Sequence, residues 1–369
     1  MWFIKPLDPS RQRSLLMLQI PFLLMLMTLP SLAVAGDDLP LWLVNTKLSG
    51  DFRYRHEGID NENSSSIYRN RIRYRLGVET IVNEKVTVGA RFASGSGDPR
   101  STNQDLGDGL SSKPISLDRA YFELTPCEHW WVTAGKIANP FVSTDLQWDT
   151  DVNFEGGISR WATGSKNVVS LTGGAVWLEP YRSSQASGLW IGQLSVSGKH
   201  GSMGSWEAAA GMYSFVVEDA LPNVFFGNTI EHTTLSYLRD FEILDVVAQV
   251  IVPAGKSKLT VTANPVMNTA TSEENIGWLA MLTWKGQFRA RTYSVSYDYR
   301  VLEADAVLGA FTDSDAAGGR TNQRGHRIVA DWELIDGFTA GGSAYFNTLS
   351  ASGDGPWYQR WMVDGVVKF

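Results

Sequence analysis

Apolar and polar residues alternate along residues 68–80, a pattern that suits an extended strand. Successive side chains of a strand point to opposite faces. One face would carry four arginines and the other mainly large apolar side chains. The first set is Arg69, Arg71, Arg73 and Arg75, and the second is Asn70, Ile72, Tyr74, Leu76 and Val78. A helix would spread the arginines around its axis and leave no apolar stripe. The segment is therefore predicted to be a strand between water and an apolar phase.

The same alternation over about ten residues returns along the whole chain. We predict sixteen strands, at residues 47–55, 68–80, 86–94, 116–124, 130–138, 154–162, 167–178, 189–198, 205–216, 230–238, 243–252, 275–284, 287–299, 326–335, 338–348 and 358–369. Short turns are expected at 83–85, 126–129, 163–166, 200–204, 239–241, 285–286 and 336–337. Long connections are expected at 58–66, 95–114, 139–153, 179–188, 217–229, 253–274, 300–325 and 349–357. This rhythm indicates an all-β fold, a transmembrane antiparallel β-barrel with short periplasmic turns and long extracellular loops.

Two segments fit this pattern poorly. The alternation slips between Arg289 and Val295, which we interpret as a β-bulge, and residues 258–263 suggest a small hairpin inside the connection 253–274. The last strand is the clearest, because it alternates up to the terminal Phe369 and so resembles the assembly signal of outer-membrane proteins. A soluble β-sandwich is the alternative, but it would leave many apolar strand faces without a second sheet to cover them.

Composition limits the class of protein. The chain has 369 residues with 14 Trp, 12 Tyr and 16 Phe, yet few helical patterns. Beyond the N-terminus no stretch reaches the roughly 18 consecutive apolar residues of a membrane-spanning helix. The single cysteine, Cys127, excludes an intrachain disulfide framework. Several tryptophans fall near predicted strand ends and suit interfacial girdles; they are Trp42, Trp130, Trp177, Trp190, Trp284 and Trp357.

Residues 1–35 have the pattern of a cleaved secretory signal peptide. Basic residues precede an apolar run from about residue 15 to residue 32, and Ala33-Val34-Ala35 follows it. We expect the mature barrel to comprise residues 36–369, and an N-terminal membrane anchor is the alternative. The segment carries three basic residues and one acidic residue, so the mature net charge is −7 − 2 = −9. An exported, acidic, β-rich chain is not expected to bind nucleic acid.

With the strands placed, a family resemblance can be named. It is carried by four stretches in the first half of the chain: residues 88–108 (VGARFASGSGDPRSTNQDLGD), 117–121 (LDRAY), 132–141 (VTAGKIANPF) and 146–156 (LQWDTDVNFEG). Over about residues 48–160 the chain resembles the putative porin family of Gram-negative outer membranes. The resemblance implies a passive diffusion channel for small hydrophilic solutes and ions, usually a 16-stranded barrel in outer-membrane lipid and often a homotrimer.

Candidate pore residues come from the first strands and the third long connection. General porins, which this layout resembles, fold that connection, here 139–153, into the pore. We expect its carboxylates to face an arginine wall across a narrow slot. The pore-lining residues so predicted are Arg53, Arg55, Arg69, Arg71, Arg73, Arg75, Arg91, Arg119, Asp145, Asp149, Asp151 and Glu155. Arginines outnumber carboxylates in this set, which predicts a weak preference for anions. The alternative is a static wall in which arginines and carboxylates neutralise each other.

Three classes of function remain at this stage. A general porin is the first, and a solute-specific channel or exporter for anionic substrates is the second. A barrel-type outer-membrane enzyme is the third, but the five histidines are scattered and no nucleophile elbow or metal-binding motif accompanies them. We therefore predict that the protein is not an enzyme and needs no cofactor or metal.

Overall fold

The computed structural model describes residues 41–95, 97–178, 187–217, 226–234 and 236–369. The predicted signal peptide and its cleavage site therefore lie outside the described residues. The chain divides into two units, residues 1–44 and residues 45–369. The first contains the short helix α3 (Leu41–Val44), and the second contains all the strands. Within the described residues, no helix is both long enough and apolar enough to cross a membrane.

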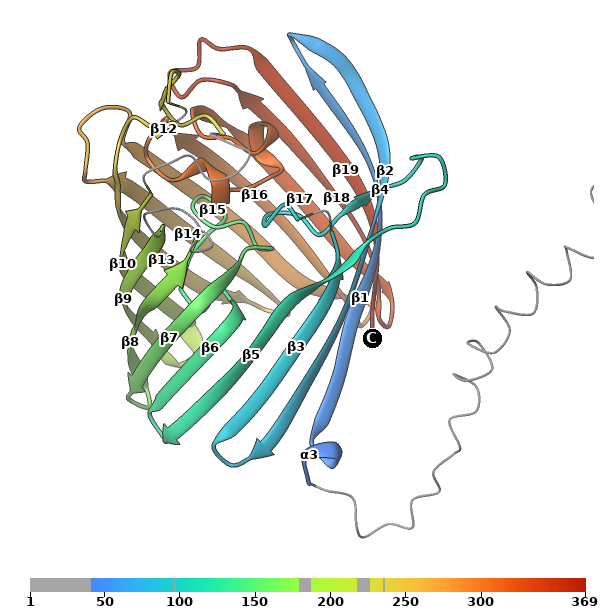
Figure 1. Ribbon diagram of the computed structural model, residues 1–369. Coiled ribbons are helices and arrows are strands. Elements are labelled where there is room, and N and C mark those ends of the chain that lie inside the picture. Colours follow the sequence, from blue (N-terminus) through green and yellow to red (C-terminus); the bar gives the residue numbers. More distant parts are fainter. Residues whose placement is uncertain (1–40, 96, 179–186, 218–225, 235) are drawn as a thin grey trace, which may run out of the picture. The chain divides into compact units, whose positions relative to one another are not determined.

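Residues 45–369 form a closed antiparallel barrel of 16 strands (Figure 1). The barrel strands are β1 (Thr46–Asn61), β2 (Ser64–Asn83), β3 (Val86–Ser94), β5 (Ile115–Cys127), β6 (Trp130–Ala138), β7 (Asn153–Thr163), β8 (Asn167–Trp177), β9 (Gly188–Lys199), β10 (Ser205–Val216), β13 (Phe241–Ala254), β14 (Ser257–Asn268), β15 (Ile276–Phe288), β16 (Arg291–Leu302), β17 (Gln323–Ile335), β18 (Phe338–Thr348) and β19 (Trp357–Lys368). Each pairs with its neighbours in the chain, and β1 also pairs with β19. The predicted fold class is confirmed.

The two ends of the barrel differ in the length of their connections. At one end, the turn end, lie connections such as 84–85, 128–129 and 336–337, together with the short helix η1 (Gly201–Met203). At the other end, the loop end, lie 95–114, 139–152, 217–240 and 303–322. These loops contain the minor elements β4 (Gln104–Asp105), β11 (Ile230–Glu231), β12 (Ser236–Tyr237), η2 (Gly309–Phe311) and η3 (Ala316–Gly318).

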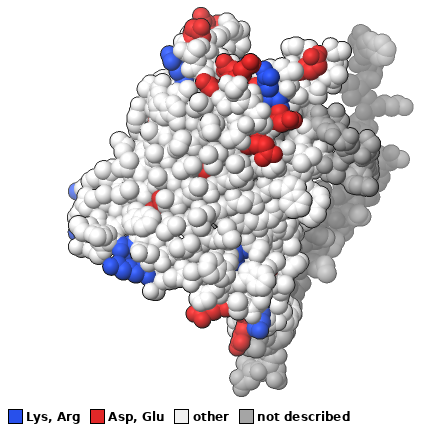
Figure 2. All heavy atoms as spheres, turned by 90° about the vertical axis from the view of Figure 1, so that its left-hand side faces the viewer, with Lys and Arg blue, Asp and Glu red and all other residues white. Residues whose placement is uncertain are grey.

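The outer surface of the barrel is largely apolar between its ends. Leu48, Leu171 and Val363 are each more than half exposed there. Exposed tryptophans lie toward both strand ends: Trp130, Trp161, Trp206 and Trp332 toward the turn end, and Trp177, Trp190, Trp278 and Trp357 toward the loop end. On the face seen in Figure 2, charged residues gather at the two ends, and few appear on the band between them. An apolar band flanked by aromatic girdles is the outer surface of a transmembrane barrel.

The terminal Phe369 lies at the seam between the first and last strands. Its N–H donates to the Gly50 carbonyl oxygen at 3.1 Å, and its own carbonyl accepts from the Gly50 N–H at 2.8 Å. A Cβ atom at position 50 would lie 2.6 Å from the Phe369 ring. The ring also lies 6.3 Å from the ring of Tyr74. Glycine at position 50 therefore makes room for the terminal aromatic ring.

One predicted strand is wrong, and another strand was not predicted. Residues 230–238 do not join the barrel, because β11 and β12 pair only with each other. The predicted short turn at 239–241 is consequently part of the connection 217–240 and the start of β13. The additional barrel strand is β14, inside the segment predicted as the long connection 253–274 with a small hairpin. The two errors cancel in the strand count, but β13 runs opposite to the predicted direction.

The sequence of β14 does not indicate a strand, because Pro265 lies in its interior. Proline has no N–H to donate and is normally confined to edges and irregular positions of a sheet. The pairing of β13 with β14 is interrupted at this point, between the pairs Asp245–Val266 and Ala248–Ala263. Beside the proline, the Asn264 side-chain amide donates to the Val246 carbonyl at 2.9 Å. A side-chain donor thus takes the place of the missing backbone donor.

Two connections also differ from the prediction. The turn expected at 285–286 lies at Arg289 and Ala290, whose φ angles of 48° and 64° suit a two-residue hairpin turn. The slip in alternation that we interpreted as a bulge is this turn, because the strand 287–299 is in fact the end of β15 and the start of β16. The connection expected at 58–66 contains only residues 62 and 63, because β1 and β2 extend further than predicted.

Candidate functional site

The arginines of β1 and β2 lie on the inner face of the barrel, and loop carboxylates meet them there. Arg73 Nη2 is 2.8 Å from Asp51 Oδ1, and Arg75 Nε is 2.7 Å from Asp51 Oδ2. Arg75 Nη1 also lies 3.2 Å from Asp151 Oδ1, in the loop 139–152. One carboxylate from a strand and one from a loop therefore balance the two guanidinium groups.

A second group surrounds Glu57 of β1, whose side chain is 0 % exposed. Arg360 Nη2 of β19 is 2.6 Å from Glu57 Oε2, and Arg71 Nη1 is 3.6 Å from Oε1. Arg69 forms an ion pair with the same carboxylate. Asp105 of β4, which pairs with β2, lies 2.6 Å from Arg71 Nε and 3.2 Å from Arg69 Nη1. Each of these arginines therefore has a carboxylate partner.

The loop 303–322 supplies a further carboxylate to this wall. Asp315 Oδ2 lies 3.4 Å from Arg55 Nη1, and Asp315 Oδ1 lies 2.9 Å from Arg360 Nη2. Arg55 Nε is also 2.7 Å from Asp364 Oδ1 of β19. Burial opposes ionisation of Asp315, but Arg360 and Arg55 hold its pKa below its usual range. The acidic residue is therefore charged and binds the loop to the strands.

A bulge in β5 places two consecutive charged residues near the same neighbours. The β3–β5 register shifts between Arg91 and Phe92, the mark of a β-bulge. Arg91 forms an ion pair with Asp118. The next residue, Arg119, donates from Nε to Asn153 Oδ1 at 2.7 Å, and Asn153 Nδ2 donates to Asp118 Oδ1 at 2.9 Å.

Two arginines of the predicted set have only neutral partners. Arg53 Nη2 donates to Asn103 Oδ1 at 2.5 Å, and Arg119 donates to Asn153 as described. Within the described part of the chain, neither forms an ion pair with a carboxylate within 4 Å. Their positive charges are therefore less compensated than those of Arg55, Arg73 and Arg75.

The loop 139–152 contacts strands far around the ring from its own. Val142 N–H donates to Gln193 Oε1 of β9, and Gln193 Nε2 donates to the Val142 carbonyl, each at 2.9 Å. Thr144 donates its hydroxyl to Asn264 of β14. The side chains of Leu146 and Trp148 are buried. This pattern of contacts carries the loop across the interior of the barrel.

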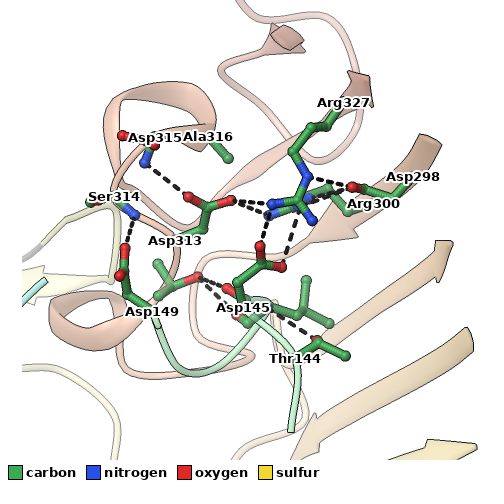
Figure 3. Close-up of polar contacts among 12 residues, drawn as sticks. Thr144, Asp145, Asp149, Asp298, Arg300, Asp313, Ser314, Asp315, Ala316 and Arg327 are labelled. Carbon is green, nitrogen blue, oxygen red and sulfur yellow. Dashed lines mark hydrogen bonds and ion pairs between the residues drawn. The ribbon is translucent and has the colours of Figure 1, made fainter. Parts of the chain in front are cut away.

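Asp145 of this loop enters an ion-pair cluster with β16, β17 and the loop 303–322 (Figure 3). It pairs with Arg327 and lies 3.4 Å from Arg300 Nη2. Arg300 Nη2 is also 2.9 Å from Asp298 Oδ1, and its Nη1 is 2.8 Å from Asp313 Oδ2. We call these five residues the Arg300 cluster. It contains two guanidinium groups and three carboxylates, so it holds one more acidic than basic side chain.

The loop carboxylates near this cluster differ in pKa. Burial opposes ionisation of Asp145, but Arg327 and Arg300 hold its pKa below the usual range. Burial raises the pKa of Asp313, and neighbouring Asp145 raises it further. Burial also raises the pKa of Asp149 well above its usual range, with Asp313 adding to the effect. Asp313 and Asp149 therefore hold their protons to higher pH than Asp145 does.

The role of the loop 303–322 was missed by the sequence prediction, which placed it only as a long connection. Asp149 N–H donates to the Phe311 carbonyl at 2.7 Å, and Asp313 N–H donates to the Asp145 carbonyl at 3.0 Å. Arg100 Nη1, from the loop 95–114, donates to the Gly319 carbonyl at 2.7 Å. Three loops therefore pack against one another inside the barrel. The paired aspartates around residue 313 were the available signal.

An apolar core accompanies these loops on one side of the interior. Trp148 lies 4.8 Å from the ring of Phe154 and 5.5 Å from that of Phe311. Inward side chains of β6 to β10 and β13 to β16 join this core; they include Ile137, Ile158, Val176, Leu189, Tyr213, Ile243, Val266, Leu279 and Leu302. These strands lie around the ring from β1 and β2, whose inward side chains include most of the predicted arginines.

Glu155 does not lie with the other predicted pore residues. It forms an ion pair with Lys136, its partner in the β6–β7 register, and its side chain is 61 % exposed. The preceding Phe154 is buried in the interior core, and strand alternation turns Glu155 to the outer face. This corrects the expectation that Glu155 faces the arginines.

Comparison with known proteins gives a family and a set of similar folds. A family model described as putative porin matches residues 59–223 and 242–350. No curated protein matches the chain. OprB of Pseudomonas putida, in its high-pH structure, is 14% identical with a TM-score of 0.62, over 88% of this chain and 94% of that one.

Two further solved structures are similar. OmpF of Salmonella typhi, in complex with daunomycin, is 12% identical with a TM-score of 0.55, over 88% of this chain and 97% of that one. A loop L8 deletion mutant of OmpT, an outer membrane protein of Vibrio cholerae, is 11% identical with a TM-score of 0.52, over 88% of this chain and 100% of that one. At such low identity these likenesses show the fold alone.

Proposed function

This chain belongs to the putative porin family, and we propose that it forms a water-filled channel for passive diffusion of small hydrophilic solutes and ions. The observation that carries the proposal is a closed barrel of 16 strands with an apolar outer band and charged residues on part of its inner face. Side chains alone cannot fill a barrel of this size. The orientation we propose, with the loop end outside the cell, follows from the usual layout of such barrels.

We further propose that the loop 139–153 narrows this channel against the arginine-bearing strands. Its contacts with β9, β14, β16 and β17 support the proposal. Ions would pass between the loop and the wall on β1, β2, β3 and β5. The homotrimer that the family resemblance implies is part of the same proposal.

The ion pairs revise the origin of any anion preference. Because Arg73, Arg75 and Arg91 have carboxylate partners, the preference should depend on arginines with neutral partners, of which Arg119 is one. Low-dielectric walls focus the field of such residues. We expect a weak preference for anions at low salt that fades at 1 M salt, where the Debye length is about 3 Å.

Reversal potentials of channels in a planar bilayer under a salt gradient test both points. Arg119→Gln should move the reversal potential toward cation preference. The matched control is the double variant Arg91→Gln with Asp118→Asn, which removes a whole ion pair and should leave the reversal potential in place. Absence of any conductance from correctly folded protein would refute the channel. Equal shifts in the single and double variants would refute the role of Arg119.

A solute-specific channel for anions is the second candidate. Its specific support is that Arg119 and Arg160 line a single cavity.

A further inference from the structure

A cavity of about 520 Å³ lies on the inner face of β5, β6 and β7, beside the start of the loop 139–152. Inward side chains of the three strands line it. We call it the β5–β7 cavity, and the residues that matter here are Arg119, Glu123, Trp131, Ile137, Ile158 and Arg160. Its volume is within the range of small-molecule sites.

The two arginines of this cavity have only neutral hydrogen-bond partners in the part of the chain that the structure describes. Arg119 donates to Asn153 at 2.7 Å, and Arg160 Nη2 donates to the Ser170 hydroxyl at 3.4 Å. The Arg160 guanidinium also lies 5.5 Å from the centre of the Trp131 ring. In the described ranges neither arginine forms an ion pair within 4 Å, unlike most arginines of β1, β2 and β3. A guanidinium group without an ion-pair partner can bind the carboxylate of a ligand through charge-assisted hydrogen bonds.

The remaining lining divides into an apolar and an acidic part. Trp131 is only partly buried and provides apolar surface next to the arginines, whereas Ile137 and Ile158 are almost fully buried behind the lining. Glu123 is occupied at least in part, because it accepts a hydrogen bond of 3.3 Å from Thr133. An inorganic anion would use the arginines alone and gain nothing from the apolar surface. A ring-bearing carboxylate would use both, since aromatic rings stack well on tryptophan.

We propose that the β5–β7 cavity binds a small carboxylate that carries an aromatic ring. The carboxylate lies between Arg119 and Arg160, and the ring contacts the exposed part of Trp131. The inference rests on the proposed channel function, because it names a solute class for that channel. The cavity would then be a binding site on the path that the solute takes along the inner wall of the barrel.

Calorimetric titration of the detergent-solubilised full barrel with benzoate tests the site. Arg160→Gln should raise the Kd for benzoate about tenfold or more, because a charge-assisted hydrogen bond is lost. Arg53→Gln is the matched control: Arg53 also has a neutral amide partner but lies outside the cavity lining, so benzoate binding should change less than about twofold. Wild-type protein should bind acetate at least about tenfold more weakly than benzoate, because acetate has no ring.

Two results overturn the proposal. Equal benzoate affinity in the wild type, Arg160→Gln and Arg53→Gln excludes the cavity, and equal affinity for acetate and benzoate excludes the ring contact. If Arg160→Gln does not fold, Trp131→Leu is the second variant, and it should weaken benzoate binding while leaving acetate binding unchanged. Bilayer recording separates this inference from the channel itself. Protein that conducts ions but binds no benzoate refutes the cavity, and protein that binds benzoate without conducting refutes the channel.

Discussion

The Arg300 cluster should respond very differently to losing a cation and to losing a carboxylate. Arg327→Gln would leave three carboxylates to one guanidinium, and two of those carboxylates come from loops. Removing one partner of a buried ion pair costs about 3–5 kcal/mol, because the remaining charge stays without compensation. We expect the free energy of opening of the loop 139–152 to fall by that amount.

Asp145→Asn should cost much less, because Asp313 can replace the lost charge. In the native cluster, burial and the charge of Asp145 raise the pKa of Asp313. With Asp145 neutral, Asp313 ionises more readily, and two guanidinium groups then face two carboxylates. The remaining cost is about 1 kcal/mol of loop stability, because the amide at position 145 makes a weaker hydrogen bond to the guanidinium groups than the carboxylate did.

Hydrogen exchange of the Trp148 and Asp149 amides measures this opening, since they donate to carbonyls within and between the loops. Exchange should accelerate roughly 10²- to 4 × 10³-fold in Arg327→Gln and about fivefold in Asp145→Asn, at 1.4 kcal/mol for each factor of ten. Arg291→Gln is the control, because its ion pair with Asp336 is exposed and worth little. Equal acceleration in the two cluster variants would refute the substitution of Asp145 by Asp313.

Two other predictions concern pH and the lipid face. Asp149 has a raised pKa, so it holds its proton to higher pH in the folded state than in the unfolded chain. The free energy of opening of the loop 139–152 should therefore fall as pH rises from about 4. Asp149→Asn should therefore flatten the increase of loop opening with pH above about 4, measured as the exchange rate divided by the intrinsic amide rate at each pH, and an unchanged slope would exclude Asp149. Tyr74→Arg should cost about 2–4 kcal/mol of unfolding free energy in lipid vesicles if the site is near the bilayer midplane, and no cost would place position 74 away from lipid.

Local alternation predicted the barrel well because apolar side chains that face lipid and polar side chains that face the interior alternate along each strand. Arg73 faces Asp51 inside, while Tyr74 on the opposite face is 36 % exposed beside Phe369. The prediction failed where a local signal misled it. Pro265 argued against β14, and the replacement donor on Asn264 cannot be recognised without the neighbouring strand.

The loops could not be predicted in this way, because their contacts join residues far apart in the sequence. Asp145 and Arg327 are 182 residues apart, and no periodicity relates them. A loop carboxylate looks the same in the sequence whether it faces water or a buried guanidinium. The arrangement of the loops 95–114, 139–152 and 303–322 therefore emerges only once the strands have set their spacing.

Carboxylates from several loops set the charge balance inside the barrel. Counting the carboxylates of the loop 139–153 alone suggested a surplus of arginines on the wall. Asp315 and Asp105 come from other loops, yet they pair with Arg55 and Arg71. These ion pairs neutralise much of the surplus positive charge on the wall. A paired arginine holds a loop in place, and its field at a distance is largely cancelled. An arginine whose partner is neutral keeps its field, so the residues that could select solutes are those without a carboxylate partner in the described ranges, among them Arg119 and Arg160.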